Sequence, residues 1–201
     1  ESIPWVGPPR DTPTRPSPET NAAALRHLGD HLRRLLRSCL ADARPGRIVR
    51  IIDTSAFLEC PAPRCYGQGT FDFLIPHTVL SELDRLRHHA QEQKRRRARR
   101  ALTRIRGWWE RRGDPIRGLT EDKTITIRFL PQDADMAEAP PAFSRQEGDD
   151  RILWTARQET LANPASAVVL VSGDSNLRIR AYLEQVESEP APSCSHVDAL
   201  D

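Results

Sequence analysis

Acidic residues stand where apolar runs end and where helical stretches begin along this sequence. The five of interest are Asp53, Glu82, Asp149, Asp150 and Asp174. Two carboxylates about 4 Å apart repel by about 4 kcal/mol at an effective dielectric constant near 20, so a cluster of them requires a cation. Mg²⁺ and Mn²⁺ accept carboxylate oxygens, and such ions activate water for phosphodiester hydrolysis. If the fold brings these acids together, their chemistry is that of a metal-dependent phosphodiesterase.

Each acid taken alone also fits a structural role, because Asp at the start of a helix caps free backbone N–H groups. Asp150 is either a further metal ligand, or only such a cap or a supporting residue beside the ligand Asp149. Asn176, close to Asp174, either orients a metal-bound water or caps the following helix, and the sequence favours neither. The prediction of a site therefore depends on the whole set of acids.

Alternating strand and helix patterns predict the elements that position these acids. Runs rich in β-branched residues predict strands at 47–52, 71–75, 124–130 and 167–171. Three- and four-residue apolar spacing predicts helices at 78–91, 93–111, 149–160 and 175–186. This alternation is typical of an α/β fold with a mostly parallel sheet, in which the carboxyl ends of the strands border one crevice. We therefore expect the acids to converge at that crevice.

The sequence divides into four regions. Six prolines in 1–20 predict a flexible arm, and leucines at helical spacing in 21–46 predict an amphipathic helix that ends before Pro45 and Gly46. Residues 47–187 form the predicted domain, in which the acidic stretch 131–148 is a surface loop. The Pro- and Ser-containing region 188–201 is predicted to be a flexible tail. The leucine face of the N-terminal helix is expected to bind the domain or a protein partner.

The composition excludes a membrane-spanning protein. The formal net charge is +2, and the longest apolar runs are far shorter than the roughly 20 residues that span a bilayer. The N-terminus lacks the charged segment and apolar run of a signal peptide, so we expect a cytoplasmic protein. The chain begins at Glu1 rather than Met, which indicates a processed or truncated chain.

The four cysteines are predicted to be reduced thiols, because their spacing is not that of a disulfide framework. They are Cys39, Cys60, Cys65 and Cys194. Cys60 and Cys65 flank a CPAPRC loop that resembles half of a zinc site. No second half of a ligand set is evident in the sequence, so metal binding there is the less favoured alternative.

Residues 85–112 form a strongly basic block, with twelve Lys or Arg against two Glu. The residues predicted to bind RNA are Arg95, Arg96, Arg97, Arg99, Arg100 and Arg104. An Arg-rich helical face can neutralise a nucleic-acid backbone, while a merely solvated face is an equal alternative. Of two adjacent tryptophans, Trp109 is predicted to lie in the core and Trp108 is left open as a surface for base stacking.

Five segments of the chain resemble the successive motifs of PIN domains. In chain order they are RIVRIIDTSAFL, FLIPHTVLSELDRL, RRRARRALTRI, GDDRILWTARQE and AVVLVSGDSNLRIRA. The resemblance covers about 47–187, and the last two motifs are the most specific. The PIN domains fused to PhoH-like ATPases and those of eukaryotic RNA-decay endonucleases are the most similar types.

The resemblance implies a three-layer α/β/α fold and an endonuclease that uses Mg²⁺ or Mn²⁺ to cleave single-stranded RNA. The four family acids fall on Asp53, Glu82, Asp149 and Asp174, and none is replaced. Hydroxyl residues that assist the acids in this family correspond to Thr54, Ser55 and Ser172. The resemblance also implies a homodimer and a role in RNA decay or as a toxin. A cognate antitoxin or another protein would then bind through the N-terminal helix.

Two alternatives remain open at the level of the sequence. Some PIN domains have lost acids and serve as non-catalytic nucleic-acid-binding or scaffold modules, although the complete acid set here argues against that reading. A nuclease that acts on DNA is the other alternative, because hydrolysis by a metal-activated water does not need the 2′-hydroxyl.

Overall fold

The protein is represented by a computed structural model that describes residues 47–110, 114, 116, 118–121 and 124–194. The predicted N-terminal arm (1–20), the predicted amphipathic helix (21–46) and residues 195–201 of the predicted tail lie outside the described residues. None of the described helices has the length and apolar character needed to cross a bilayer.

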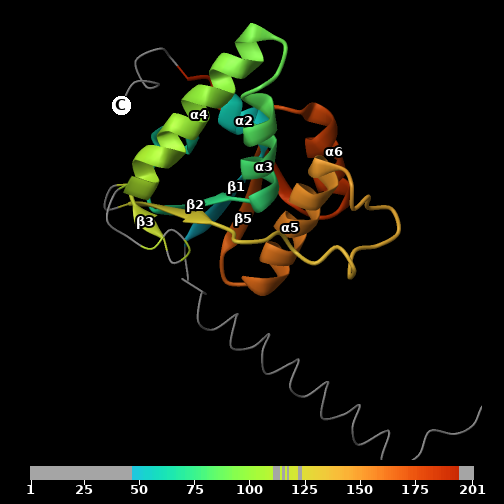
Figure 1. The fold of residues 1–201 in the computed structure, drawn as a ribbon. Helices are drawn as coiled ribbons and strands as arrows, with labels where there is room; N and C mark the ends of the chain where they lie inside the picture. Colours follow the sequence, from blue (N-terminus) through green and yellow to red (C-terminus); the bar gives the residue numbers. More distant parts are fainter. Residues whose placement is uncertain (1–46, 111–113, 115, 117, 122–123, 195–201) are drawn as a thin grey trace, which may run out of the picture. The chain divides into compact units, whose positions relative to one another are not determined.

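A six-stranded sheet forms the centre of the domain, in the order β3-β4-β2-β1-β5-β6 (Figure 1). The strands are β1 (Ile48–Ile52), β2 (Phe71–Ile75), β3 (Leu119–Thr120), β4 (Ile125–Phe129), β5 (Ala167–Ser172) and β6 (Glu187–Pro190). Every pairing is parallel except that of β3 with β4. The four strands predicted from the sequence are confirmed, and the short β3 and β6 were not predicted.

Helices cover both faces of this sheet and give a three-layer α/β/α fold, as predicted. They are α2 (Thr54–Glu59), the 3-10 helix η1 (Pro63–Tyr66), α3 (His77–Leu86), α4 (Glu92–Glu110), α5 (Gly148–Ala162) and α6 (Ser175–Leu183). Helices α2, α3 and α4 pack against one another, whereas α5 and α6 pack against β5. The short helices α2 and η1, which are six and four residues long, were not predicted.

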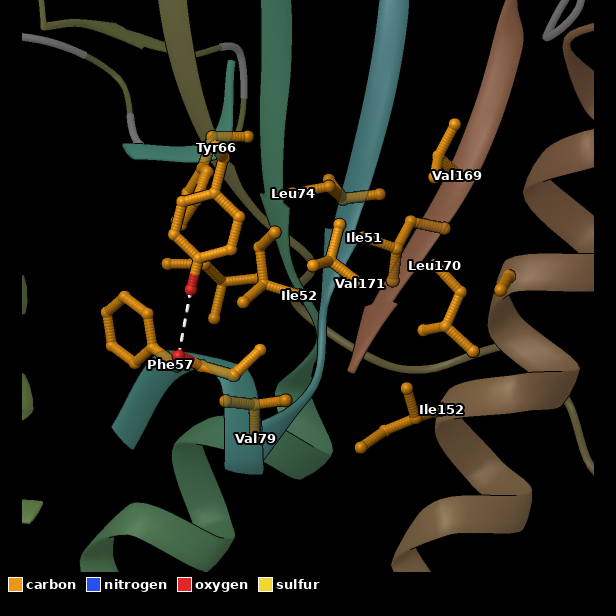
Figure 2. Close-up of a cluster of buried hydrophobic side chains, with 14 of the residues drawn as sticks. Ile51, Ile52, Phe57, Tyr66, Leu74, Val79, Ile152, Val169, Leu170 and Val171 are labelled. Carbon is orange, nitrogen blue, oxygen red and sulfur yellow. Dashed lines mark hydrogen bonds between the residues drawn. The ribbon is translucent and has the colours of Figure 1, made fainter. Parts of the chain in front are cut away.

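The core consists of apolar side chains from the central strands and from the helices on either side. Ile51 and Ile52 are adjacent on β1 and point to opposite faces of the sheet, and both are fully buried. Such burial on two faces is typical of a parallel sheet between helical layers. Figure 2 shows these two residues among core side chains from other elements, including Phe57 of α2, Val79 of α3 and Ile152 of α5.

The structure buries Trp108, whose role was left open, and exposes Trp109, which was predicted to lie in the core. Trp108 is 1% exposed and packs against Phe57, Phe73 and Phe129, with ring centroids 6.0 to 6.4 Å apart. Trp109 is 67% exposed, so its predicted core position was wrong. The buried stripe of α4 runs through Ala98 and Ala101 to Trp108, which is one residue earlier in helical phase than the sequence suggested. Trp108 therefore offers no surface for base stacking.

The predicted tail is wrong for 188–190, because these residues belong to β6 and pair with β5. Helix α6 ends three residues earlier than predicted. Gln185 adopts a left-handed conformation (φ 59°), and the N–H of the buried Val186 donates to Ala181 O at 2.9 Å. This is the usual turn at the end of a helix, here formed by Gln in place of the common Gly. The sequence signal for the end of α6 was therefore absent.

The prediction of four reduced cysteines is also corrected by the structure. Cys60 at the end of α2 and Cys194 after β6 form a disulfide, with their Cα atoms 5.3 Å apart. The two residues are 134 positions apart in sequence, and β6 brings Cys194 back to the sheet beside α2. Cys65 lies next to this pair, with its Sγ 3.1 Å from Cys194 Sγ. Cys39 lies outside the described residues.

Candidate active site

Asp53 is the buried acid at the carboxyl end of β1. Its side chain caps α2 by accepting a hydrogen bond from Ala56 N at 2.7 Å. The hydroxyls of Ser55 (2.9 Å) and Ser172 (2.5 Å) also donate to its carboxylate. Three donors fix the direction of this carboxylate, so Asp53 is both the start of a helix and a positioned ligand.

Burial changes the acid strength of Asp53. Desolvation is the largest influence and raises the pKa of its carboxyl from 3.8 to about 6, although hydrogen bonds from Ala56, Ser172 and Ser55 oppose it. The negative charge of Asp149 adds to the rise. Among the described residues no Lys or Arg forms an ion pair with Asp53, so its ionised form lacks a cationic partner.

Asp174 lies at the carboxyl end of β5, the strand adjacent to β1. Its side chain caps α6 through a 2.7 Å hydrogen bond from Asn176 N, and its own N–H donates to Ser172 Oγ at 2.9 Å. Since Ser172 Oγ also donates to Asp53, one buried hydroxyl links the two acids. The adjacent Gly173 N–H donates to Ser55 Oγ at 2.8 Å and ties the β5 end to α2.

Asp149 of α5 and Glu82 of α3 complete the set of acids. Asp149 is in the first turn of α5, where the helix dipole favours a negative charge. Partial desolvation raises the pKa of Asp149, and the negative charges of Glu82 and Asp174 raise it further. Glu82 accepts a short hydrogen bond from Thr54 Oγ1, so its carboxylate is held beside the start of α2.

This arrangement requires a glycine at position 148, because there is no room for a side chain there. A Cβ atom at Gly148 would overlap the Glu82 carboxylate and would lie 3.3 Å from the Thr78 methyl. The missing side chain lets Glu82 of α3 approach the first turn of α5. The closeness of Glu82 and Asp149 therefore depends on a glycine that the sequence analysis did not single out.

Three of the four predicted acids border one pocket of about 340 Å³. Its lining residues are Asp53, Thr54, Ser55, Leu58, Glu59, Leu86, Lys94, Arg97, Asp149 and Asp174. Glu82 borders a neighbouring pocket with Gly148 and reaches the main one through its bond to Thr54. The predicted convergence of acids at the carboxyl ends of β1 and β5 is therefore seen in the structure.

Glu59 and Lys94 also border this pocket and were not predicted. Glu59 is in α2, four residues after Ser55, so both lie on one face of that helix. The i, i+4 spacing from Ser55 to Glu59 was the available signal, but α2 itself was missed. Lys94 is in the first turn of α4 and adds a positive charge to the lining of the pocket.

Neither Asp150 nor Asn176 lines the acid pocket. Asp150 is 2% exposed, forms a short ion pair with Arg180 and accepts from Ser144 N at 2.5 Å. These contacts assign Asp150 a structural role, and it does not line the pocket described above. Asn176 is exposed, and the cap of α6 is Asp174. The alternative in which Asn176 caps this helix is therefore wrong.

The six arginines predicted to bind RNA differ in their surroundings. Arg97 lines the pocket, and Arg99 is exposed. Arg95 and Arg96 both pair with Glu92, and Arg100 donates to Glu59 O at 3.5 Å. Arg104 pairs with Glu121 at 3.3 Å and lies over the ring of Trp108, 18% exposed. The structure therefore makes Arg97 the best placed of the six to contact a ligand in the pocket.

The donor atoms in this pocket fit a hard divalent cation. Carboxylate and hydroxyl oxygens predominate, and the lining residues include no Cys or His. Mg²⁺ and Mn²⁺ prefer such oxygen ligands. Burial, with a further contribution from neighbouring negative charges, raises the pKa values of Asp53 and Asp149, and a bound cation would stabilise their ionised forms. Asp53, Asp149 and Asp174 would hold the ion, with Glu82 beside them.

The comparison with protein families identifies the class. A PIN domain model matches residues 50–191, which is more than two thirds of the 201 residues. The chain belongs to the PIN domain family, as the motifs predicted. No curated protein is similar enough to count as a match. One similar solved structure is a domain of a functionally unknown protein from Methanocaldococcus jannaschii DSM 2661, with 14% identity and a TM-score of 0.44. That match covers 74% of this chain and 94% of the other.

Proposed function

We propose that this PIN domain is an endoribonuclease that uses Mg²⁺ or Mn²⁺ to hydrolyse phosphodiester bonds of single-stranded RNA. The observation that carries the proposal is the pocket that Asp53, Asp149 and Asp174 line together with Lys94 and Arg97. The carboxylates suit a divalent ion, and the cationic side chains suit the phosphates of a bound strand.

Each residue of the pocket has a distinct part in this proposal. A bound divalent ion would neutralise the carboxylates and stabilise charge on the leaving oxygen. Ser55 and Ser172 hold the Asp53 carboxylate in one orientation, and Thr54 does the same for Glu82. Asp149, in the first turn of α5, would hold the ion together with Asp53 and Asp174, and the bound ion would activate the attacking water.

Lys94 and Arg97 would bind phosphate groups and position the strand for in-line attack by water. Because water and not the 2′-hydroxyl is the nucleophile, the products should carry a 5′-phosphate and a 3′-hydroxyl. The same chemistry acts on DNA, and the preference for RNA is supported by the motif resemblance alone.

The test is cleavage of end-labelled single-stranded RNA and single-stranded DNA by the native chain with Mg²⁺ or Mn²⁺. We expect Asp53→Asn and Asp149→Asn to lower the rate at least about a hundredfold, as for removal of a group that stabilises the transition state. Asp84→Asn is the matched control, since Asp84 is exposed on α3 and pairs only with Arg87 among the described residues.

Cleavage that depends on metal and on Asp53 and Asp149, with Asp84→Asn active, would support the proposal. Faster cleavage of DNA than of RNA would overturn the substrate class. A folded native chain that cleaves neither strand with either ion would instead support a binding or scaffold module.

A further inference from the structure

A cluster of three cysteines lies outside the acid pocket. The Sγ atoms of Cys60, Cys65 and Cys194 all lie within 4.8 Å of one another, and those of Cys65 and Cys194 are 3.1 Å apart. The residues come from three places in the chain, namely the end of α2, η1 and the segment after β6. The fold, and not local sequence spacing, therefore brings the three sulfurs together.

The loop that carries two of these cysteines has a constrained backbone. Pro61 and Pro63 fix two of the four φ angles between Cys60 and Cys65, and Cys65 N donates to Ala62 O at 3.1 Å in a tight turn. Tyr66 OH donates to Ala56 O and Cys60 O, at 2.9 and 2.7 Å, and anchors the loop to the end of α2. The positions of Cys60 and Cys65 are thus set before any bond between sulfurs forms.

The disulfide joins two of the three clustered sulfurs, and the third, that of Cys65, lies 3.1 Å from Cys194 Sγ. The bond between Cys60 and Cys194 cross-links α2 to the segment after β6, and this cross-link does not need a third cysteine beside it. Three thiolates this close would repel one another, as carboxylates do, unless a cation lay between them. Zinc bound by thiolates at about 2.3 Å in tetrahedral geometry has sulfur atoms about 3.8 Å apart, which is within the spread seen here.

We propose that in the reduced protein Cys60, Cys65 and Cys194 bind one zinc ion as thiolates, with water in the fourth position. The disulfide between Cys60 and Cys194 is then the oxidised, metal-free state of the same cluster. The chemistry of soft sulfur ligands distinguishes this site from the acid pocket, whose oxygen ligands suit harder ions. Cys60 follows Asp53 by seven residues along α2, so the two sites are roughly 10 Å apart at helical rise.

The two states exchange by a balanced reaction with a peroxide. The Cys60 and Cys194 thiolates each give up one electron and form the S–S bond. Hydrogen peroxide takes both electrons and two protons and becomes two molecules of water. Zinc then leaves, because Cys65 alone is not sufficient to hold it. A dithiol reductant reverses the oxidation and restores the ligand set.

Cobalt titration of the reduced full chain tests the site, because cobalt bound by thiolates has a charge-transfer absorption in the near ultraviolet that cobalt on carboxylates lacks. We expect this absorption to saturate at one cobalt per chain, to disappear when zinc is added and to be lost on treatment with peroxide. Cys65→Ser should lower the affinity at least about tenfold while still forming the disulfide on oxidation. Asp84→Asn, which changes none of the three cysteines, is the control and should titrate like the native chain.

Absence of the thiolate absorption in the reduced native chain would overturn the proposal, as would a Cys65→Ser variant that binds cobalt like the native chain. RNA cleavage by the same samples is measured separately. A chain that binds cobalt through its thiolates but does not cleave RNA would contradict the proposed nuclease and leave the zinc site supported.

Discussion

The carboxylate of Asp53 serves two purposes that conflict in energy. It caps α2 through Ala56 N and receives the Ser172 hydroxyl, and both contacts stabilise the fold. Burial nevertheless raises its pKa to about 6, so the ionised form needed for a metal ligand is unfavourable in the metal-free protein. In the metal-free protein the buried charge of Asp53 therefore lowers the stability of the fold, and ion binding would remove this destabilisation.

Asp53→Asn should be more stable than the native chain at pH 7.5 in the presence of a chelator. A carboxyl with a raised folded-state pKa stabilises the fold fully below its unfolded value of 3.8 and loses this stability as the pH rises through about 6. The native chain thus loses about 3 kcal/mol across this window. After allowance for a weakened hydrogen bond, we expect a gain of about 1 to 2 kcal/mol in the variant.

Denaturant unfolding of both proteins at pH 4 and at pH 7.5 measures this effect. The variant should gain its advantage only at the higher pH, and saturating Mn²⁺ should reverse the order of stability there. An advantage of equal size at both pH values would contradict the assigned cause.

Gly148→Ala should impair cleavage with little loss of stability, because the added methyl would overlap the Glu82 carboxylate and displace it from Thr54. A misplacement of about 1 Å at a catalytic group can cost about a hundredfold in rate. Gly107→Ala in α4 is the matched control, since a Cβ there meets open space. It should raise stability by up to about 1 kcal/mol without changing cleavage. Full activity of Gly148→Ala would show that the position of Glu82 is unimportant.

At the scale of elements, α4 directs its many arginines to different surroundings. Arg97 faces the acid pocket, whereas Arg104 is held against Trp108 and Glu121. Arg106 follows Arg97 by nine residues and therefore projects from the opposite side of the helix. The number of arginines on α4 is thus larger than the number that can contact one nucleic-acid strand.

Arg97→Glu should lower the affinity for single-stranded RNA by about tenfold at moderate salt and reduce the salt dependence of binding. Arg106→Glu makes the same charge change at a position that is 73% exposed and pairs with Glu110 at 3.7 Å, and it should have little effect. Binding is measured by fluorescence anisotropy over a range of salt concentrations with Ca²⁺ in place of the catalytic ion. Equal losses in the two variants would indicate a general charge effect and contradict the assignment of Arg97.

The strands with strong apolar patterns could be predicted from the sequence. Which side of each helix faces the core could not. The apolar runs of β1, β2, β4 and β5 identified these strands, because both faces of each are buried between helices. Trp108 and Trp109 differ by 100° on α4, and only the packing of Phe57 and Phe73 decides which one is buried. The same ambiguity applies to the adjacent Asp149 and Asp150, because the sequence does not show which of the two borders the pocket. The ion pair with Arg180 of α6 determines the direction of the Asp150 side chain.

At the scale of the whole molecule, the order of the strands brings the acids together. Asp53 and Asp174 are 121 residues apart in sequence, yet they follow β1 and β5, which pair in parallel. The rule for parallel sheets made this convergence predictable. The cysteine cluster was not predictable, because it depends on β6, whose sequence ESEP has neither the alternation nor the β-branched residues of a typical strand.

Removal of 187–201 should cause self-association, because it exposes the edge of β5, an apolar strand of sequence AVVLVS. We expect larger species in size-exclusion chromatography that increase with protein concentration. Removal of 195–201 alone retains β6 and should leave the elution unchanged. Cys194→Ser in the full chain separates loss of the strand from loss of the cross-link. A truncated chain that elutes as the control does would show that β6 does not protect this edge.

The capping roles of Asp53 and Asp174 constrain how this domain could change in evolution. Each acid begins the helix that follows it, so replacement by Ala would remove a helix cap worth about 1 kcal/mol together with the ligand. Replacement by Asn or Ser would keep a cap and remove only the negative charge. Descendants of such a domain would therefore lose catalysis most readily through Asp to Asn or Ser changes. In a related sequence, the residues that correspond to Asp53 and Asp174 would distinguish an inactive domain that keeps the fold from an active nuclease.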